Sequence, residues 1–226
     1  MTSRYWVRFF FRTLFLGGAS SVLVGFIARW SEFQPYFTNL DILSILSTAF
    51  WLFGVGLIFS VLSQMGYFAY LTIHRFGLGI FKTIGLWNGV QWLFIAVVLF
   101  DLVYFRFQAF AEENESVIPY VFISGFLLII GLVVATLKAR QTNKDTFVSA
   151  LFFMVVITTI EWFPVLRANE EGWLFFMLIP LVTCNAYQLL RLPKYLVLSQ
   201  LEREKRQQRK AAESTTMNQK RKPKTT

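Results

Sequence analysis

Cysteine and histidine each occur once in this 226-residue chain, as Cys184 and His74. One cysteine excludes an internal disulfide framework and a multi-cysteine metal or iron–sulfur site, and one histidine excludes every motif that needs two. Charged residues are also scarce, at 15% of the chain against 55% hydrophobic residues. Soluble domains carry about 25% charged residues, so the composition predicts a membrane protein.

Long apolar runs account for most of the chain. A bilayer hydrocarbon core of about 30 Å requires about 20 residues of helix, with a lower limit near 17. Six runs reach that range, and they cover residues 9–28, 44–71, 84–105, 117–137, 146–163 and 173–190. We therefore expect an all-α polytopic integral membrane protein, with residues 1–190 forming one bundle of six transmembrane helices.

Basic residues are concentrated in alternate connections between these runs. Nineteen of the 22 Lys and Arg residues fall at the N-terminus, after the second and fourth runs, or after the sixth. The other connections hold most of the acidic residues and receive only Arg29, Arg106 and Arg167. Short cytoplasmic loops are enriched in Lys and Arg, so both termini are predicted to be cytoplasmic. The net charge of +9 then indicates orientation, and no nucleic-acid partner is expected.

The second apolar run is longer than a perpendicular span needs. Its 28 residues would form about 42 Å of helix at about 1.5 Å per residue, which raises the alternative of a hairpin. A hairpin would reverse the sides of all later loops and would spoil the charge asymmetry. A single tilted helix is the favoured interpretation.

The chain changes character after residue 190. Residues 191–213 are predicted to form a juxtamembrane amphipathic, charged helix, and Ser199 with Glu202 suggests a capping box at its start. Glu202 and Arg206 are placed to pair one helical turn apart. Residues 214–226 are polar and basic and are predicted to be a disordered tail.

Small residues four apart predict close helix packing. Gly17, Ser21 and Gly25 form such a line on the first span, and Gly85 with Gly89 forms another on the third. Packing within one bundle is the favoured interpretation, and a homodimer seam is the alternative. The sequence predicts no oligomeric state.

Arg4, Arg8 and Arg12 recur every four residues and therefore lie on one side of a helix. Aromatic residues stand between them, so the stripe is a candidate for contact with anionic phospholipid headgroups or with an acidic cytoplasmic partner. The simpler reading, which we favour, is cytoplasmic charge that snorkels to the surface and sets orientation.

Asp101 and Glu161 lie inside or at the edge of apolar runs, where ionisable side chains are costly and are usually paired. Arg29, Arg106 and Arg167 are predicted at the same level of the membrane. An intramembrane layer of ion pairs formed by these five residues is the expected structural role. The sharper alternative is a proton or cation pathway, although no further acids lie deeper in the bundle.

Other strongly polar residues within or near the spans are few: Gln64, Asn88, Gln91, Asn185 and Gln188. Asn88 and Gln91 share a helix face, and together with Asp101 and Glu161 they define an alternative function, a small transporter or ion-coupled permease. The chain lacks the His-Glu-x-x-His zinc motif and the Gly-x-Ser-x-Gly nucleophile elbow. No catalytic residue, cofactor or metal is therefore predicted, and an enzyme is not expected.

Three short strings resemble a known family. They are the opening Ser3-Arg-Tyr-Trp-Val-Arg-Phe-Phe-Phe-Arg-Thr-Leu-Phe-Leu-Gly-Gly, the Glu161-Trp162-Phe163 end of the fifth run, and the exit Arg191-Leu-Pro-Lys-Tyr-Leu. With the six-span layout, they resemble the KinB-signalling pathway activation proteins, KbaA, of spore-forming bacteria. The resemblance covers about residues 1–200.

The resemblance implies a multi-pass protein of the bacterial plasma membrane. It implies an accessory role in which the chain activates a KinB-type sensor histidine kinase, whose phosphorelay starts sporulation. The implied partner is the kinase or its membrane partner, contacted in or at the membrane. The family brings no catalytic residues to carry over, so no site gains support from it.

Overall fold

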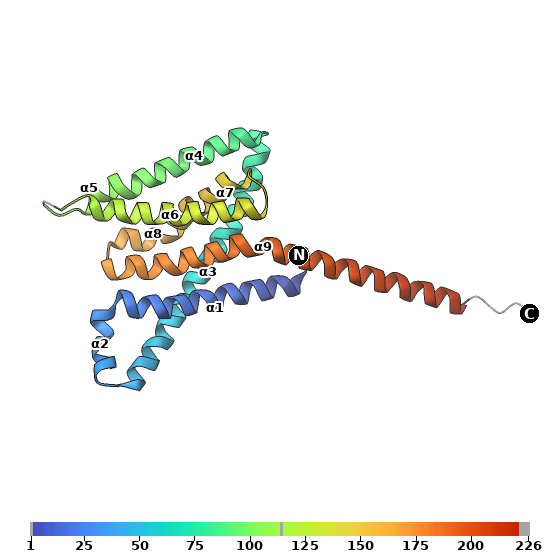
Figure 1. Cartoon of the computed structure of the whole chain (residues 1–226), viewed down its shortest axis with the longest axis horizontal. Coiled ribbons are helices and arrows are strands. Elements are labelled where there is room, and N and C mark those ends of the chain that lie inside the picture. The colour runs from blue at the N-terminus through green and yellow to red at the C-terminus, as the bar shows by residue number, and fades with distance from the viewer. Residues whose placement is uncertain (1, 114, 222–226) are drawn as a thin grey trace, which may run out of the picture. The chain divides into compact units, whose positions relative to one another are not determined.

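The computed structural model describes residues 2–113 and 115–221, together with all side chains in these ranges except those of Glu171 and residues 210–221. The regular structure in these ranges is entirely helical (Figure 1). The chain forms two compact units. One contains Arg12–Leu190, and the other combines the N-terminal residues up to Phe11 with the chain from Arg191 onward.

The helices follow one another with short connections. In chain order they are α1 (Ser3–Ala28), α2 (Trp30–Thr38), α3 (Ile42–Phe81), α4 (Ile84–Phe100), the π-helical segment η1 (Asp101–Phe105), α5 (Arg106–Phe110), α6 (Ile118–Gln141), α7 (Thr146–Phe152), the π-helical segment η2 (Phe153–Ile157), α8 (Thr158–Ala168) and α9 (Glu171–Arg221).

Six helices in the described ranges are long and apolar enough to cross a membrane, in agreement with the six apolar runs. They are Ser3–Ala28, Ile42–Phe81, Ile84–Phe110, Ile118–Gln141, Thr146–Ala168 and Gly172–Arg209. The third consists of α4, η1 and α5 in succession, and the fifth of α7, η2 and α8. Hydropathy did not predict α2, because this helix has only nine residues and is too short to cross a bilayer.

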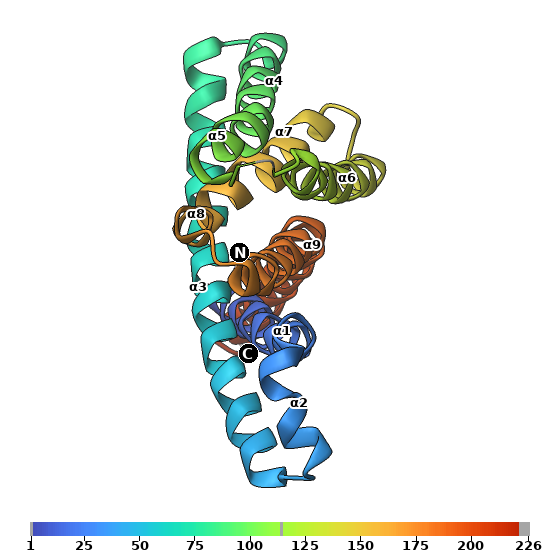
Figure 2. The same ribbon diagram turned by 90° about the vertical axis from the view of Figure 1, so that its left-hand side faces the viewer.

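Helix α3 is one uninterrupted helix of 40 residues, so the second apolar run is not a hairpin. At about 1.5 Å per residue, such a helix measures about 60 Å, roughly twice the thickness of a hydrocarbon core. Figure 2 looks along several of the other helices and shows α3 lying across them. The helix also extends beyond the apolar run and includes His74.

Side-chain caps and a left-handed residue define the two ends of α3. At its start, Asp41 accepts hydrogen bonds from the backbone N–H of Ser44 at 3.1 Å and from its hydroxyl at 2.6 Å. These bonds favour the carboxylate and lower the pKa of Asp41, so this cap weakens as the pH falls through that lowered value. At the other end Lys82 adopts φ 57°, and Thr83 then caps α4 by accepting from Leu86 N–H.

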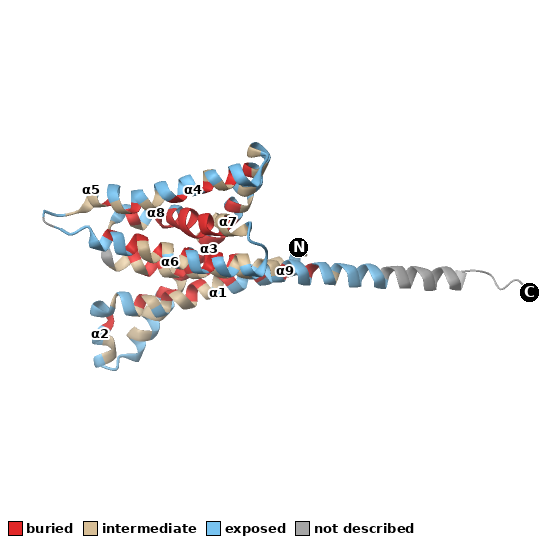
Figure 3. Ribbon diagram, turned by 45° about the horizontal axis from the view of Figure 1, so that its top comes forward, coloured by how far each residue is buried: buried red, intermediate tan, exposed pale blue. Residues whose placement is uncertain are grey.

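The fifth span is the central element of the unit Arg12–Leu190. Buried residues are concentrated in α7 and α8 in Figure 3. Of the 18 most apolar consecutive residues of the fifth span, 72% are buried, compared with 17% of the corresponding residues of the second span. Helix α7 packs on α4 and α6, η2 packs on α3, α4 and α6, and α8 packs on α3.

Helices α1 and α3 approach each other through small residues. A Cβ atom on Gly17 would lie 2.5 Å from Ser60 Cβ and 3.0 Å from the Gly56 carbonyl oxygen. A Cβ on Gly56 would lie 2.5 Å from Ser21 Cβ, and one on Gly25 would lie 2.5 Å from a Leu52 methyl carbon. The line Gly17, Ser21, Gly25 therefore lies where α1 meets α3 within one chain.

Gly85 and Gly89 on α4 differ from this line. A Cβ built on either residue would have no neighbouring atom within 4 Å. These two glycines therefore lie in open space, and their packing role stays a prediction.

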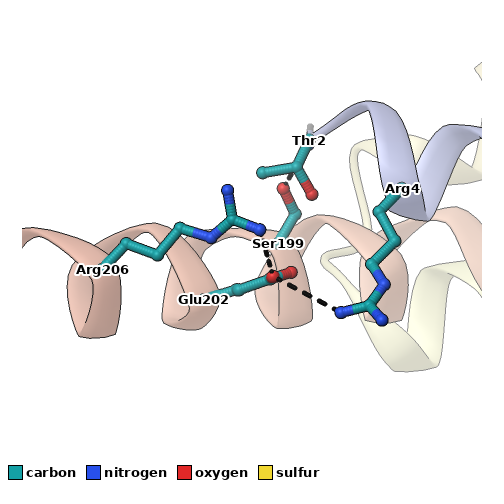
Figure 4. A network of polar contacts seen from close by, with 5 residues as sticks. All are labelled: Thr2, Arg4, Ser199, Glu202 and Arg206. Carbon is teal, nitrogen blue, oxygen red and sulfur yellow. Dashed lines mark hydrogen bonds and ion pairs between the residues drawn. The ribbon is translucent and has the colours of Figure 1, made fainter.

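The second unit joins the N-terminal part of α1 to α9. Phe9 is 1% exposed and lies edge-on to Tyr195, with ring centroids 5.3 Å apart. The Thr2 backbone N–H donates to Ser199 Oγ at 2.6 Å, while Glu202 pairs with Arg206 at 2.9 Å and with Arg4 at 3.9 Å (Figure 4). The contacts between the two segments are thus aromatic and polar.

The pairing of Glu202 with Arg206 confirms the sequence prediction, but the capping box is wrong. Ser199 lies inside α9, which runs without interruption from Glu171 to Arg221, and its hydroxyl accepts from Thr2 instead of capping a new helix. The helix includes residues 191–213 and continues into the segment predicted to be a disordered tail. Residues 222–226 of that segment lie outside the described residues.

Substitution of Gly56 tests the contact between α1 and α3. Gly56→Leu should lower the free energy of unfolding by roughly 1–3 kcal/mol, because the new side chain would overlap Ser21 and the Gly17 backbone. The matched control is Gly54→Leu on the same helix, where a Cβ meets no atom within 4 Å. Unfolding of the purified protein in mixed micelles, followed by circular dichroism, measures the difference. Equal losses in both variants would contradict the proposed contact.

Candidate functional site

A cluster of buried polar side chains lies within the unit Arg12–Leu190. Its members come from three helices: Ser60, Ser63 and Gln64 from α3, Thr158 and Glu161 from α8, and Asn185 and Gln188 from α9. All seven are 7% exposed or less. Hydrocarbon supplies no hydrogen-bonding groups, so polar side chains at such positions must bind one another.

Asn185 is the centre of this cluster. Its Nδ2 donates to Thr158 Oγ1 at 2.9 Å and to Glu161 Oε2 at 2.7 Å. Its Oδ1 accepts from the Ser63 hydroxyl at 2.7 Å. The Asn185 amide therefore forms hydrogen bonds to two other helices, α3 and α8. Gln188 extends this hydrogen-bond network, because its Nε2 donates to Ser63 Oγ at 2.6 Å.

Glu161 is 4% exposed and lies against Gly66 of α3. A Cβ on Gly66 would overlap Glu161 Oε1, so the missing side chain is what lets the carboxyl group reach this position. Oε2 is bonded to Asn185, whereas Oε1 has no hydrogen-bond partner among the described atoms. The carboxyl group is thus held from one side only.

A second polar layer adjoins the first. The Ser60 hydroxyl donates to the backbone carbonyl of Thr13 at 2.9 Å, and Gln64 Nε2 lies 3.4 Å from Ser60 Oγ. The Cys184 thiol lies 3.7 Å from the same Thr13 oxygen. This layer connects α1, α3 and α9 and places the single cysteine in a structural contact.

The chemistry available to the cluster is limited. Glu161 is the ionisable carboxyl group of the cluster, and its hydrogen-bond partner is the Asn185 amide. The described residues contain no group of three His, Cys, Asp or Glu side chains placed to hold a metal ion. His74 lies elsewhere and accepts a hydrogen bond from Trp87 Nε1 at 3.0 Å. The geometry is that of a polar brace between helices.

The five residues expected to form an ion-pair layer are not paired with one another in the described structure. Arg29 pairs instead with Glu32, at 2.5 and 2.8 Å, because Arg29 is the N-cap residue of α2 and Glu32 lies three residues later in its first turn. Arg106 is buried and donates to Asn169 Oδ1 at 2.6 Å. Asp101 and Arg167 are exposed. Glu161 bonds to Asn185 as described above.

The other polar residues singled out in the sequence are also separated. Gln91 Oε1 accepts from the Ser149 hydroxyl at 3.1 Å, and the Ser149 carbonyl accepts from Tyr70 at 3.0 Å. Asn88 Oδ1 has no hydrogen-bond partner in the described part of the chain. Among the described residues, no hydrogen bond joins Asn88 or Gln91 to Glu161.

The basic stripe at the N-terminus spans the two units. Arg4 and Arg8 are exposed, and the Arg8 guanidinium lies 5.8 Å from the centre of the Tyr5 ring. Arg4 also reaches Glu202 (Figure 4). Arg12 is exposed and begins the larger unit. Contact of this stripe with lipid or with a partner remains a prediction.

Sequence reasoning missed Ser63, Thr158 and Gly66 as members of the polar cluster. Small hydroxyl residues and glycine are common in membrane helices, so none of the three stands out singly. A weak signal did exist, because Asn185 and Gln188 share one face of α9 while Ser60, Ser63 and Gln64 share one face of α3. Matching the two faces requires the tertiary structure.

These observations define a class: an all-helical protein with six helices long and apolar enough to cross a membrane, joined by buried hydrogen bonds between their side chains. The profile of one family, KbaA, described as KinB-signalling pathway activation in sporulation, matches residues 17–195. The chain belongs to this family. The matched range includes every residue of the buried polar cluster.

A curated relative agrees with this assignment. The chain is 51% identical over 195 residues to a KinB-signaling pathway activation protein of Bacillus subtilis (strain 168). The alignment covers 86% of this chain and 98% of the relative. No solved structure matches the chain.

Replacement of Asn185 tests the brace. Asn185→Leu should lower the free energy of unfolding by about 1–3 kcal/mol, because it leaves Ser63, Thr158 and Glu161 without their shared partner. The matched control is Asn88→Leu, since the Asn88 carbonyl oxygen is already unpaired and its loss should be near neutral. Unfolding in mixed micelles compares the two. Equal stability of both variants would show that the brace contributes little.

Proposed function

We propose that this chain is an accessory protein of the bacterial plasma membrane that activates a KinB-type sensor histidine kinase pathway leading to sporulation. It acts by protein–protein interaction in or at the membrane, with the kinase or the kinase's membrane partner, and performs no chemistry of its own. The observation that carries this proposal is the 51% identity to the Bacillus subtilis relative across nearly its whole length.

The bundle offers apolar surface for such an interaction. In the second and third spans, only 17% of the 18 most apolar consecutive residues are buried, which is the lowest share among the six spans. On α4, Gly85 and Gly89 lie in open space, and small residues let a second helix approach closely. The polar groups of the bundle centre are directed inward, so the outer faces are suited to lipid or to partner helices.

The charge pattern supports a cytoplasmic contact as well. On the predicted orientation both termini face the cytoplasm, and the exposed Arg4 and Arg8 lie close to the membrane surface. A row of guanidinium groups attracts anionic phospholipid or an acidic surface of a cytoplasmic partner. Either contact would hold the N-terminal part of α1 at the site of kinase regulation.

Complementation tests the proposal. In a Bacillus subtilis strain lacking its own relative, this chain should restore KinB-dependent sporulation. Arg8→Ala combined with Arg12→Ala should lower that activity severalfold without preventing membrane insertion, because the paired substitution removes two attractive charges, each contributing about 1 kcal/mol near an anionic surface. Spore counts and the amount of membrane-inserted protein are the measurements.

The charge-conserving control is Arg8→Lys combined with Arg12→Lys, which should retain most activity. Failure of the unmodified chain to complement, at normal membrane levels, would contradict the proposed function. Equal activity of the alanine and unmodified proteins would instead remove the role of the basic stripe.

Glu161 separates the signalling function from a transporter or ion-coupled permease. Glu161→Gln is nearly isosteric and retains an oxygen that accepts from Asn185, so we expect unchanged sporulation activity in well-inserted protein. Glu161→Gln therefore removes the ionisable carboxyl group and leaves the shape of the side chain nearly unchanged. Loss of activity at normal membrane levels would favour an ion-coupled mechanism, which flux measurements in proteoliposomes would then test.

A further inference from the structure

A pocket of about 880 Å³ opens at one end of the unit Arg12–Leu190. It lies among the α1–α2 turn, α5, the start of α6 and the junction of α8 with α9. Its lining includes Arg29, Arg106, Tyr120, Ile123, Asn169 and Gly172. Small-molecule sites have volumes of about 300–1,000 Å³, so the size suits a small ligand. The charge pattern predicts that this end faces the outside of the cell.

Arg106 is the most unusual residue in this pocket. It is only 7% exposed, and yet, among the described residues, its guanidinium group donates a single hydrogen bond, to Asn169 Oδ1 at 2.6 Å. The guanidinium carbon lies over the Tyr120 ring, 5.4 Å from the ring centre, in a cation–π contact. Nε and one terminal nitrogen have no hydrogen-bond partner among the described atoms.

Buried, unpaired donors on a charged group are costly, and a ligand that supplies oxygen acceptors would relieve that cost. Carboxylates match guanidinium geometry and form charge-assisted hydrogen bonds with it. We propose that this pocket is a binding site for a small carboxylate ligand, with Arg106 as the residue that holds the carboxylate.

The remaining charges of the pocket favour a carboxylate over a multiply charged anion. Arg29 is already paired with Glu32, so it adds little free positive charge. Glu112 and Glu115 also line the pocket and would repel a dianion such as phosphate. The same two acids would attract an amino group, which extends the ligand class to amino acids and short peptides.

The chain positions Arg106 from two sides. Asn169 ends α8 with φ 52°, a left-handed turn that presents its side chain to Arg106. Tyr120 is held by a weaker contact, its hydroxyl 3.4 Å from Glu115 Oε2. At Gly172 an added Cβ would meet only Arg29 Cγ, at 3.8 Å, so this position faces the open part of the pocket.

Thermal unfolding of the full-length protein in lipid nanodiscs tests the site, with L-alanine, alanylalanine and sodium acetate as probes. At least one probe should raise the midpoint saturably at millimolar concentration, whereas sodium phosphate and sodium chloride of equal ionic strength should not. Absence of a shift with all three carboxylates, or an equal shift with phosphate, overturns the proposal.

Three variants assign any shift to the pocket. Arg106→Gln should weaken binding about tenfold or more, because it removes a charged hydrogen-bond donor. Gly172→Leu should weaken it similarly by filling the pocket while Arg106 remains, which keeps the test valid if Arg106→Gln fails to fold. Arg167→Gln removes an exposed arginine near the same end and should bind normally. Unchanged binding in both pocket variants would overturn the assignment.

Discussion

The hydrogen bonds of Asn185 are the interaction on which the bundle depends most. In water, an asparagine finds partners anywhere, but in hydrocarbon it must find them on neighbouring helices. Asn185 on α9 meets Ser63 on α3 together with Thr158 and Glu161 on α8, so its position determines how three helices align. Gly66 is the steric complement of this arrangement, because it leaves space for the Glu161 carboxyl group.

Helix α3 explains how the polar cluster and the close helix contacts coexist. Gly56 and Ser60 receive α1, Ser63 and Gly66 receive the polar groups of α8 and α9, and all four lie within three turns of one helix. Because α3 crosses several other helices, successive parts of its length meet different partners, among them α2, α4, η2 and α8 (Figure 2). A 40-residue helix is long enough to contact several helices along its length, whereas a shorter helix perpendicular to the membrane plane would contact fewer of them.

The buried polar cluster and the pocket differ in how far their polar groups are paired. In the centre, the Asn185 amide bonds to side chains of its own bundle, which favours one arrangement of helices. At the pocket, Arg106 has two nitrogens without a hydrogen-bond partner among the described atoms, and we propose that a ligand binds them. A ligand bound at this end, as proposed, would alter the bundle near α8 and α9, whereas the proposed contact with the kinase pathway would lie on the predicted cytoplasmic side.

The sequence by itself determined the six apolar helices, the charge asymmetry and the family, because helix length, Lys and Arg placement and short strings are local properties. It also identified Glu161, Asn185 and Gln188 as polar residues in apolar surroundings. Only the tertiary structure decided their partners: Glu161 binds Asn185 rather than an arginine, and Arg106 binds Asn169. The π-helical segment η2, immediately before Thr158, changes the register of the residues that follow, and hydropathy carries no trace of it. Partners depend on how faces of distant helices meet, which no local pattern specifies.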